Sequence, residues 1–242
     1  MSFLRRLLGR EPETSRVLFI GNSLTRFEAL HDLPALLTRM ARSRGVELIT
    51  GTLARNAASL GDYREDAEAG AALRSGDWDL VVLQENSERA LLDEAATGAD
   101  VRVLSARIRA AGRRTALFAT WPPADRAGSA EKLSRVYREF AAETGALCVP
   151  VGDAWARSAA ERPELRLRMK DGVHPSAAGA YLSACVFYES LFAGGLRGAS
   201  AEARADDLAA VRALASAQAR AGEDDRSAVA DGELQFLRSI AA

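Results

Sequence analysis

Ser23 is the first residue of this chain whose type and setting suggest chemistry. It lies in RVLFIGNSLT, Arg16 to Thr25, after four consecutive apolar residues, 17–20, that predict a strand buried on both faces. The turn Gly21-Asn22-Ser23 ends that strand, and open α/β sheets bind their ligands beyond the C-terminal ends of such strands. A serine at this point can act as a nucleophile or can simply cap the next helix.

A serine nucleophile needs a base within hydrogen-bond reach, and the chain contains only two histidines. His31 precedes the helix start Asp32-Leu33-Pro34, so we expect a structural or exposed residue. His174 lies in DGVHPS, three residues after Asp171, and this spacing lets the carboxylate contact Nδ1 while Nε2 points outward. Such a pair fixes the tautomer and stabilises the imidazolium formed during proton transfer. The alternative is that Asp171 forms the turn and His174 is a cap.

Two further residues, on loops after later strands, are candidate donors to an oxyanion. Gly61 could present its backbone N–H where a side chain would obstruct a substrate, and Asn86 could offer its side-chain amide. Taken alone, Gly61 is simply a turn residue and Asn86 a helix cap. Because loops that follow parallel strands emerge at the same edge of the sheet, we expect Ser23, Gly61 and Asn86 to lie near one another.

The elements that must position these residues follow a regular alternation. The sequence predicts strands at residues 17–20, 46–50, 80–83, 114–120 and 146–151, separated by helices at about 32–44, 62–74, 93–111 and 129–144. Strands joined by helices of ten or more residues imply βαβ crossovers and therefore a parallel sheet. The last third is predicted to contain a helix and loop at 152–165, an apolar helix at 177–192, and an alanine-rich helical segment at 199–242 broken near 221–225.

The composition fits one α/β domain with additions. The chain has 242 residues, of which 48% are hydrophobic and 27% charged, and its net charge of −1 gives no field that attracts nucleic acid. Cys148 and Cys185 lack CxxC spacing, which predicts small core residues rather than a zinc site or a disulfide. No apolar run resembles a secretory signal or spans a membrane, so we expect a cytoplasmic protein. An amphipathic helix at residues 3–8 could contact a surface or a partner.

Two of the motifs closely resemble blocks of the SGNH/GDSL hydrolases. IGNSLT is similar to the first block of that family, with Asn22 where the family more often has aspartate. DGVHPS is similar to the fifth block and supplies its aspartate and histidine at Asp171 and His174. The resemblance extends over about residues 16–192.

The second and third blocks are matched less closely. NAASLGD resembles the second block and would place its glycine at Gly61, although another alignment places Ala57 or Ala58 there. QENS resembles a degenerate third block, in which Asn86 matches the asparagine while the usual glycine and following aspartate are missing.

The resemblance implies a fold, a site and a domain organisation. The fold would be a three-layer, flavodoxin-like α/β/α arrangement with a five-stranded parallel sheet. Ser23, Asp171 and His174 would form a catalytic triad. The oxyanion hole would comprise the backbone N–H groups of Ser23 and Gly61 with the Asn86 amide. The domains would be an N-terminal extension at 1–15, a hydrolase domain at 16–195, and a tail at 196–242 that packs on the domain or contributes to a homo-oligomer.

We therefore expect hydrolysis of a small-molecule carboxylic ester through an acyl-serine intermediate, without a metal or other cofactor. Short-chain or acetyl esters, including acetylated carbohydrates, are the substrates that the resemblance implies. Asn22, Gln84 and Trp121 are candidate pocket residues, although Trp121 fits a core position equally well. Two alternatives stay open: acyl transfer to an alcohol or sugar by the same triad, or a binding module that keeps the fold without turnover.

Overall fold

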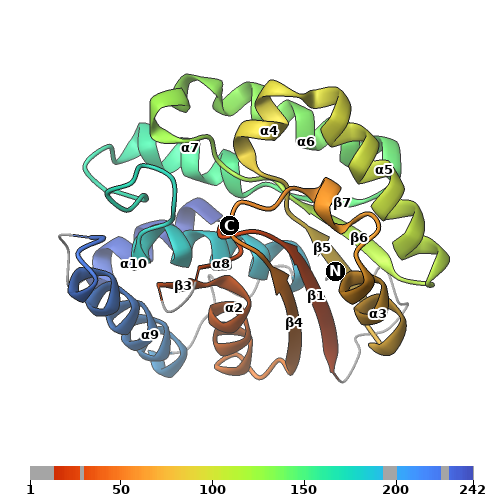
Figure 1. Ribbon diagram of the computed structural model, residues 1–242. Coiled ribbons are helices and arrows are strands. Elements are labelled where there is room, and N and C mark those ends of the chain that lie inside the picture. Colours follow the sequence, from red (N-terminus) through yellow and green to blue (C-terminus); the bar gives the residue numbers. More distant parts are fainter. Residues whose placement is uncertain (1–13, 28–29, 193–200, 225–228, 242) are drawn as a thin grey trace. The chain divides into compact units, whose positions relative to one another are not determined.

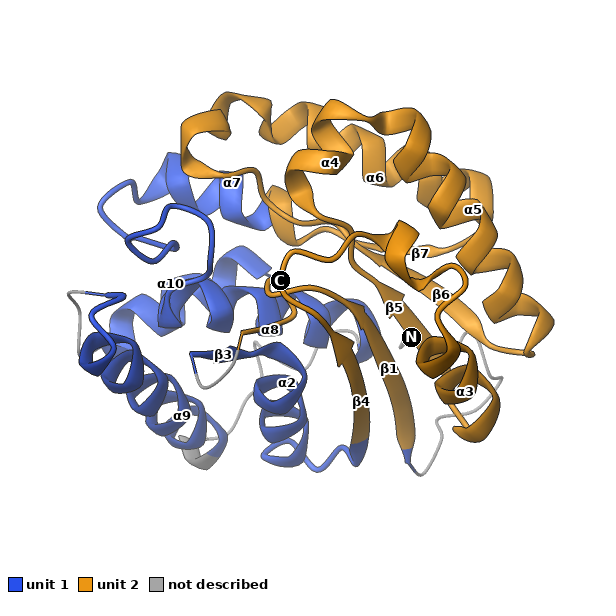
Figure 2. Cartoon of the chain, in the orientation of Figure 1, with its two compact units in different colours: residues 1–14, 28–48, 154–242 blue, residues 15–27, 49–153 orange. Residues whose placement is uncertain are grey.

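The computed structural model describes residues 14–27, 30–192, 201–224 and 229–241. The amphipathic helix predicted at residues 3–8 lies outside the described residues. The chain divides into two compact units (Figure 2). Unit 1 comprises residues 1–14, 28–48 and 154–242, and unit 2 comprises residues 15–27 and 49–153.

Unit 2 is built on a five-stranded sheet (Figure 1). Its strands are β1 (Ser15–Gly21), β4 (Leu48–Ala54), β5 (Leu80–Leu83), β6 (Arg114–Phe118) and β7 (Leu147–Val149). They lie side by side in the order β4-β1-β5-β6-β7, which is the flavodoxin-like order 2-1-3-4-5 when the strands are counted along the chain. The pairing is parallel, with Val17 opposite Leu80 and Leu80 opposite Arg114. The predicted α/β class and parallel sheet are confirmed.

Helices of unit 2 pack against this sheet and enclose an apolar core. They are the 3-10 helix η1 (Leu60–Tyr63), α3 (Ala67–Ser75), α4 (Ser87–Leu92), α5 (Glu94–Ala110), the 3-10 helix η2 (Ala124–Ser129) and α6 (Ala130–Thr144); the short strand β2 (Arg26–Phe27) completes the unit. Along α5, the buried residues Val101, Leu104 and Ile108 recur at three- and four-residue spacing and so share one side of the helix. Leu133 and Tyr137 do the same along α6. These faces form one buried cluster with the sheet residues Leu18, Ile20, Val81 and Leu83.

Unit 1 is mainly helical. It contains β3 (His31–Asp32), α2 (Leu33–Arg42), α8 (Ala177–Phe192), α9 (Ala201–Arg220) and α10 (Asp231–Ala241), while α7 (Val151–Glu161) begins in unit 2 and continues in unit 1. The helices α2, α9 and α10 all pack against α8. Because partners surround it, α8 is apolar on all sides rather than along one stripe, as the sequence of residues 177–192 predicts. The two helices of the predicted tail thus pack on α8 within unit 1.

Several predicted boundaries differ from the structure. The second strand, predicted at 46–50, runs from Leu48 to Ala54. The helix predicted at 62–74 is divided into η1 and α3, because Asp66 accepts the backbone N–H of Ala69 at 2.7 Å and begins a new helix. The fifth strand ends at Val149, and α7 begins two residues later.

A buried ion pair joins α9 to the end of α2 in unit 1. The carboxylate of Asp207 is 2.7 Å from Nη2 and 3.1 Å from Nη1 of Arg44, and both side chains are at most 5% exposed. The hydroxyl of Tyr181 on α8 donates a third hydrogen bond to Asp207 at 2.8 Å. A bidentate pair of this kind is directional, so it fixes how the tail packs as well as contributing energy.

Replacing Asp207 by asparagine should lower the free energy of unfolding by about 3 kcal/mol, because the buried guanidinium of Arg44 loses its counter-charge. Asp206→Asn, one residue earlier on the exposed side of α9, is the matched control and should change stability by less than about 0.5 kcal/mol. Urea unfolding followed by circular dichroism measures both variants. Equal effects of the two substitutions would show that the Arg44–Asp207 pair contributes nothing specific.

Candidate active site

Ser23 lies in a tightly bonded turn at the C-terminal end of β1. The carbonyl oxygen of Asn22 accepts the N–H groups of Thr25 at 2.9 Å and Arg26 at 3.2 Å, and its side-chain oxygen accepts the N–H of Leu24 at 3.0 Å. Ser23 itself is half-buried, whereas its neighbours Asn22 and Leu24 are buried. The neighbouring strand is β5, so Ser23 lies at the point where the strand order of a flavodoxin-like sheet reverses and where such sheets bind ligands.

Gln84, the residue after β5, holds this turn against the neighbouring strand. Its side-chain oxygen accepts the backbone N–H of Asn22 at 2.8 Å and the hydroxyl of Thr25 at 3.0 Å, and the side chain is fully buried. A Cβ on Gly21 would lie 2.5 Å from that same oxygen, so only glycine permits the contact. Asn22 and Gln84, both predicted as pocket residues, thus bond within the frame that supports Ser23.

The turn is also bonded to the loop that follows β4. The side-chain amide of Asn22 donates to the carbonyl oxygen of Ala58 at 2.9 Å. The Gly21 carbonyl oxygen accepts the Tyr63 hydroxyl at 2.6 Å and the Arg55 N–H at 3.2 Å. The loop with the predicted second donor is therefore anchored directly to the end of β1.

Gly61 is the second residue of η1, a helix whose start is defined by a capping box. The backbone N–H of Ser59 donates to the Asp62 carboxylate at 2.7 Å, and this bond, with a second from the Ser59 hydroxyl, holds the pKa of Asp62 below its ordinary value. N–H groups in a first turn have no intrahelical acceptor, so the Gly61 N–H is suited to an external one. A Cβ on Gly61 would lie 3.1 Å from the Asp100 carboxylate, which is a second reason for glycine here.

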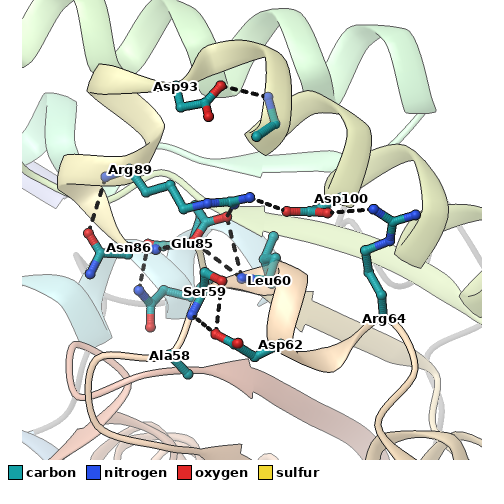
Figure 3. Close-up of polar contacts among 12 residues, drawn as sticks. Ala58, Ser59, Leu60, Asp62, Arg64, Glu85, Asn86, Arg89, Asp93 and Asp100 are labelled. Atoms are coloured by element: carbon teal, nitrogen blue, oxygen red, sulfur yellow. Dashed lines mark hydrogen bonds and ion pairs between the residues drawn. The ribbon is translucent and has the colours of Figure 1, made fainter.

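Asn86 caps α4, as one of the two predictions for it states. Its side-chain oxygen accepts the backbone N–H groups of Glu88 at 3.0 Å and Arg89 at 3.2 Å. Because the oxygen is directed at the helix, the amide nitrogen is directed away from it (Figure 3). Capping and donation use opposite ends of the same amide, so the two roles predicted for Asn86 are compatible.

Glu85 is the residue that the sequence analysis missed. Its fully buried carboxylate accepts the N–H of Leu60 at 3.2 Å and of Asn86 at 2.6 Å, and it pairs with Arg89 at 2.5 Å (Figure 3). Burial raises the pKa of Glu85 above its ordinary value, although the Asn86 N–H and the charge of Arg89 act in the opposite direction. The i,i+4 spacing of Glu85 and Arg89 was the available clue in the sequence.

Trp121 and the two cysteines pack in or against the apolar cores of their units. Trp121 is 1% exposed and meets Phe118 edge to face, with 6.2 Å between ring centroids. Cys148 packs half-buried against the core of unit 2, where burial raises the pKa of its thiol to about 11, and Cys185 is fully buried in unit 1. His31 is also buried. These positions agree with the core role predicted for the cysteines.

Asp171 and His174 form a hydrogen-bonded pair in unit 1, just before α8. One carboxylate oxygen of Asp171 is 2.6 Å from Nδ1 of His174, and the other accepts the N–H groups of Val173 at 2.8 Å and His174 at 3.0 Å. Asp171 therefore shapes the turn and orients the imidazole at the same time. The helix cap is Ser176 rather than His174, because the Ser176 hydroxyl accepts the N–H of Gly179 at 3.2 Å.

Two general properties bear on the kind of site. Within residues 14–27, 30–192, 201–224 and 229–241, no group of three or more His, Cys, Asp or Glu side chains could hold a metal ion. None of the helices in the described part of the chain combines the length and apolar character needed to cross a membrane.

Comparison with solved structures identifies the type of fold. A proposed SGNH hydrolase from Slackia heliotrinireducens is 29% identical, with a TM-score of 0.62 over 73% of this chain and 98% of that one. A DUF4886 family protein from Bacteroides uniformis is 19% identical, with a TM-score of 0.65 over 83% and 95%. The acetylxylan esterase Axe2 from Geobacillus stearothermophilus is 17% identical, with a TM-score of 0.59 over 75% and 96%. No protein-family model matches the sequence, and no curated protein matches it.

These similarities confirm the resemblance predicted from the motifs. The fold of this chain is similar to that of the SGNH hydrolases. The predicted fold class, with a five-stranded parallel sheet in flavodoxin-like order, is likewise confirmed. The likeness supports a hydrolase of the esterase type.

The hydrogen bond between Asp171 and His174 should make the free energy of unfolding depend on pH in acid. Burial acts to raise the pKa of Asp171, but hydrogen bonds from the His174 imidazole and from two backbone N–H groups outweigh it and hold the pKa below its ordinary value. A carboxylate whose pKa is lower in the folded than in the unfolded protein stabilises the fold above its ordinary pKa of about 4, and this contribution is lost as the pH falls through the folded pKa.

The free energy of unfolding should therefore fall less between about pH 5 and pH 2.5 in Asp171→Asn than in the unaltered protein. Urea midpoints across this range measure the difference. Asp125→Asn, at an exposed position in η2, is the control and should retain the original pH dependence. If the urea midpoints of all three proteins fell equally with pH, the hydrogen bonds of Asp171 would not lower its pKa in the folded protein.

Proposed function

We propose that the protein is a serine esterase that hydrolyses carboxylic esters. Ser23 of unit 2 is the nucleophile, His174 of unit 1 is its general base, and Asp171 orients His174. The observation that carries this proposal is the bonding of three loops in an SGNH-type fold: the Ser23 turn is joined to Gln84 and to Ala58, next to the segments that hold Asn86 and Gly61. The loops begin at the ends of neighbouring strands, which supports assigning Ser23 as the nucleophile and Gly61 and Asn86 as donors.

The proposed reaction has two stages. The Ser23 hydroxyl attacks the ester carbonyl while His174 Nε2 accepts its proton, and His174 then protonates the departing alkoxide to leave an acyl-serine. Water, deprotonated by His174, releases the acid and restores the serine. Asp171 keeps the proton on Nδ1 and stabilises the imidazolium in both stages.

The negative oxygen of each tetrahedral intermediate needs donors that are fixed in advance. We assign this role to the backbone N–H groups of Ser23 and Gly61 and to the side-chain amide of Asn86. Each donor is held by bonds on its other side, through the Asn22 turn, the capping box of η1 and the cap of α4. Little reorganisation is then required when charge develops, which is the condition under which such donors are most effective.

For substrate we propose short-chain and acetyl esters, including acetylated carbohydrates. Solved structures of similar fold include acetylxylan esterases, which supports this class. The cytoplasmic location, the independence of cofactors and the hydrolase domain at residues 16–195 stay predictions.

Ser23→Ala should abolish covalent labelling by a fluorophosphonate and lower kcat for p-nitrophenyl acetate by at least about 10³-fold, because the nucleophile is lost. Intact-mass spectrometry and the release of p-nitrophenol measure the two effects. Labelling of the unaltered protein at another serine, or no labelling and no ester cleavage, would refute the esterase. Formation of a new ester when an acceptor alcohol is added would instead indicate acyl transfer.

The two roles of Asn86 can be separated by two substitutions. Asn86→Asp keeps an oxygen that caps α4 but has no amide to donate, whereas Asn86→Ala removes both functions. Both should lower kcat by about 10²- to 10³-fold, and only the alanine variant should lose about 1 kcal/mol of stability. Steady-state kinetics and thermal unfolding test this together, and an active Asn86→Asp variant would exclude the donor role.

A further inference from the structure

Glu85 is held at both its backbone and its side chain. Its carbonyl oxygen accepts the Gln84 side-chain amide at 2.7 Å and the hydroxyl of Tyr137 at 3.3 Å. Its carboxylate accepts the N–H groups of Leu60 and Asn86 and pairs with Arg89. A buried carboxylate is costly unless such partners surround it. Apolar residues of similar size in place of the Glu85–Arg89 ion pair would stabilise the fold equally well. The charge therefore calls for a reason beyond stability.

The bonds of the carboxylate reach both loops with proposed oxyanion donors. The Leu60 N–H lies one residue before Gly61, and the Asn86 N–H belongs to the donor residue itself. One side chain thus connects η1, which follows β4, to the start of α4, which follows β5 (Figure 3). A shift of either loop would break a hydrogen bond to Glu85.

A chain of charges continues from Glu85 and returns to η1. Arg89 bridges from Glu85 to the buried Asp100 on α5, with 2.6 Å between Nη2 and Oδ2. The other oxygen of Asp100 accepts a hydrogen bond from Nη1 of Arg64 at 3.3 Å, and Arg64 is the residue that follows η1. The helix that contains Gly61 is consequently anchored at its start by Glu85 and at its end by Asp100.

We propose that Glu85 is a positioning residue of the oxyanion hole, whose carboxylate holds the Gly61 N–H and the Asn86 amide at a fixed separation. This inference rests on the proposed esterase function. Glu85 acts through the two donors and does not itself contact the substrate. In this chain the Glu85 carboxylate connects the loops of Gly61 and Asn86 by hydrogen bonds. It does so although QENS lacks the glycine and aspartate that are usual in the third block.

The test is Glu85→Gln, which keeps the shape of the side chain. One end of the glutamine side chain is an NH₂ group, which cannot accept a hydrogen bond. The variant therefore loses its bonds either to the backbone N–H groups or to Arg89. We expect kcat for p-nitrophenyl acetate to fall by about 10- to 100-fold while KM changes by less than about threefold, because the donors act on the transition state.

The decisive measurement is a double-mutant cycle with Asn86→Ala. If Glu85 acts through the donors, Glu85→Gln should cost only a few-fold in the Asn86→Ala background, far less than in the unaltered protein. Effects that multiply independently would overturn the inference. Asp207→Asn, which breaks another buried arginine–carboxylate pair, is the matched control and should lower stability without changing kcat.

Two further experiments separate the role of Glu85 from an effect on folding and from the esterase proposal itself. If Glu85→Gln does not fold, Arg89→Lys replaces it, since the single nitrogen of lysine cannot reproduce the separate Nη1 and Nη2 contacts of Arg89 with Glu85 and Asp100. This variant should lower kcat by about 3- to 10-fold with the same dependence on Asn86. Wild-type labelling at Ser23 together with unchanged kcat in Glu85→Gln would refute only the role of Glu85. Absence of Ser23 labelling in the wild type would refute the esterase itself.

Discussion

The hydrogen bond from the Asn22 backbone N–H to the Gln84 side chain joins the ends of two adjacent parallel strands, and the candidate site depends on it. The bond is compatible only with glycine at position 21, because any Cβ there would overlap the Gln84 oxygen. The same oxygen accepts Thr25, so the four-residue turn that contains Ser23 is bonded at both ends. A serine in a loop without such bonds would lack a defined direction of attack.

Two of the polar side chains assigned to the proposed site each serve two purposes. Asn86 caps a helix with its oxygen and leaves its nitrogen for donation. Asp171 shapes a backbone turn with one oxygen and orients an imidazole with the other. Each feature can be explained by local stability alone. The SGNH-type fold favours the catalytic interpretation, since the caps and turns of unit 2 lie at the switch point of its sheet.

The parts of the structure that the sequence predicts well are those encoded over a few residues. The apolar run 17–20 defines β1, the alternation of strands and helices defines the parallel sheet, and the three-residue spacing of Asp171 and His174 produces the observed hydrogen bond. The bond from Leu60 to Glu85 spans 25 residues and depends on strand order, so the motif QENS alone does not reveal it. The length of β4 was also missed, since Gly51 and small residues resemble a loop when their partner strand is unknown.

A crystal structure of the protein after reaction with a fluorophosphonate ester would show directly whether Ser23 is the nucleophile and Gly61 and Asn86 are the donors. If Ser23 is the nucleophile, phosphorus will be bonded to Ser23 Oγ, with the phosphonyl oxygen about 3 Å from the Gly61 backbone nitrogen and from the Asn86 side-chain nitrogen. His174 Nε2 is then expected within hydrogen-bond distance of Ser23 Oγ. A phosphonyl group on another residue, or one whose oxygen faces solvent away from Gly61 and Asn86, would contradict the assignment of this site.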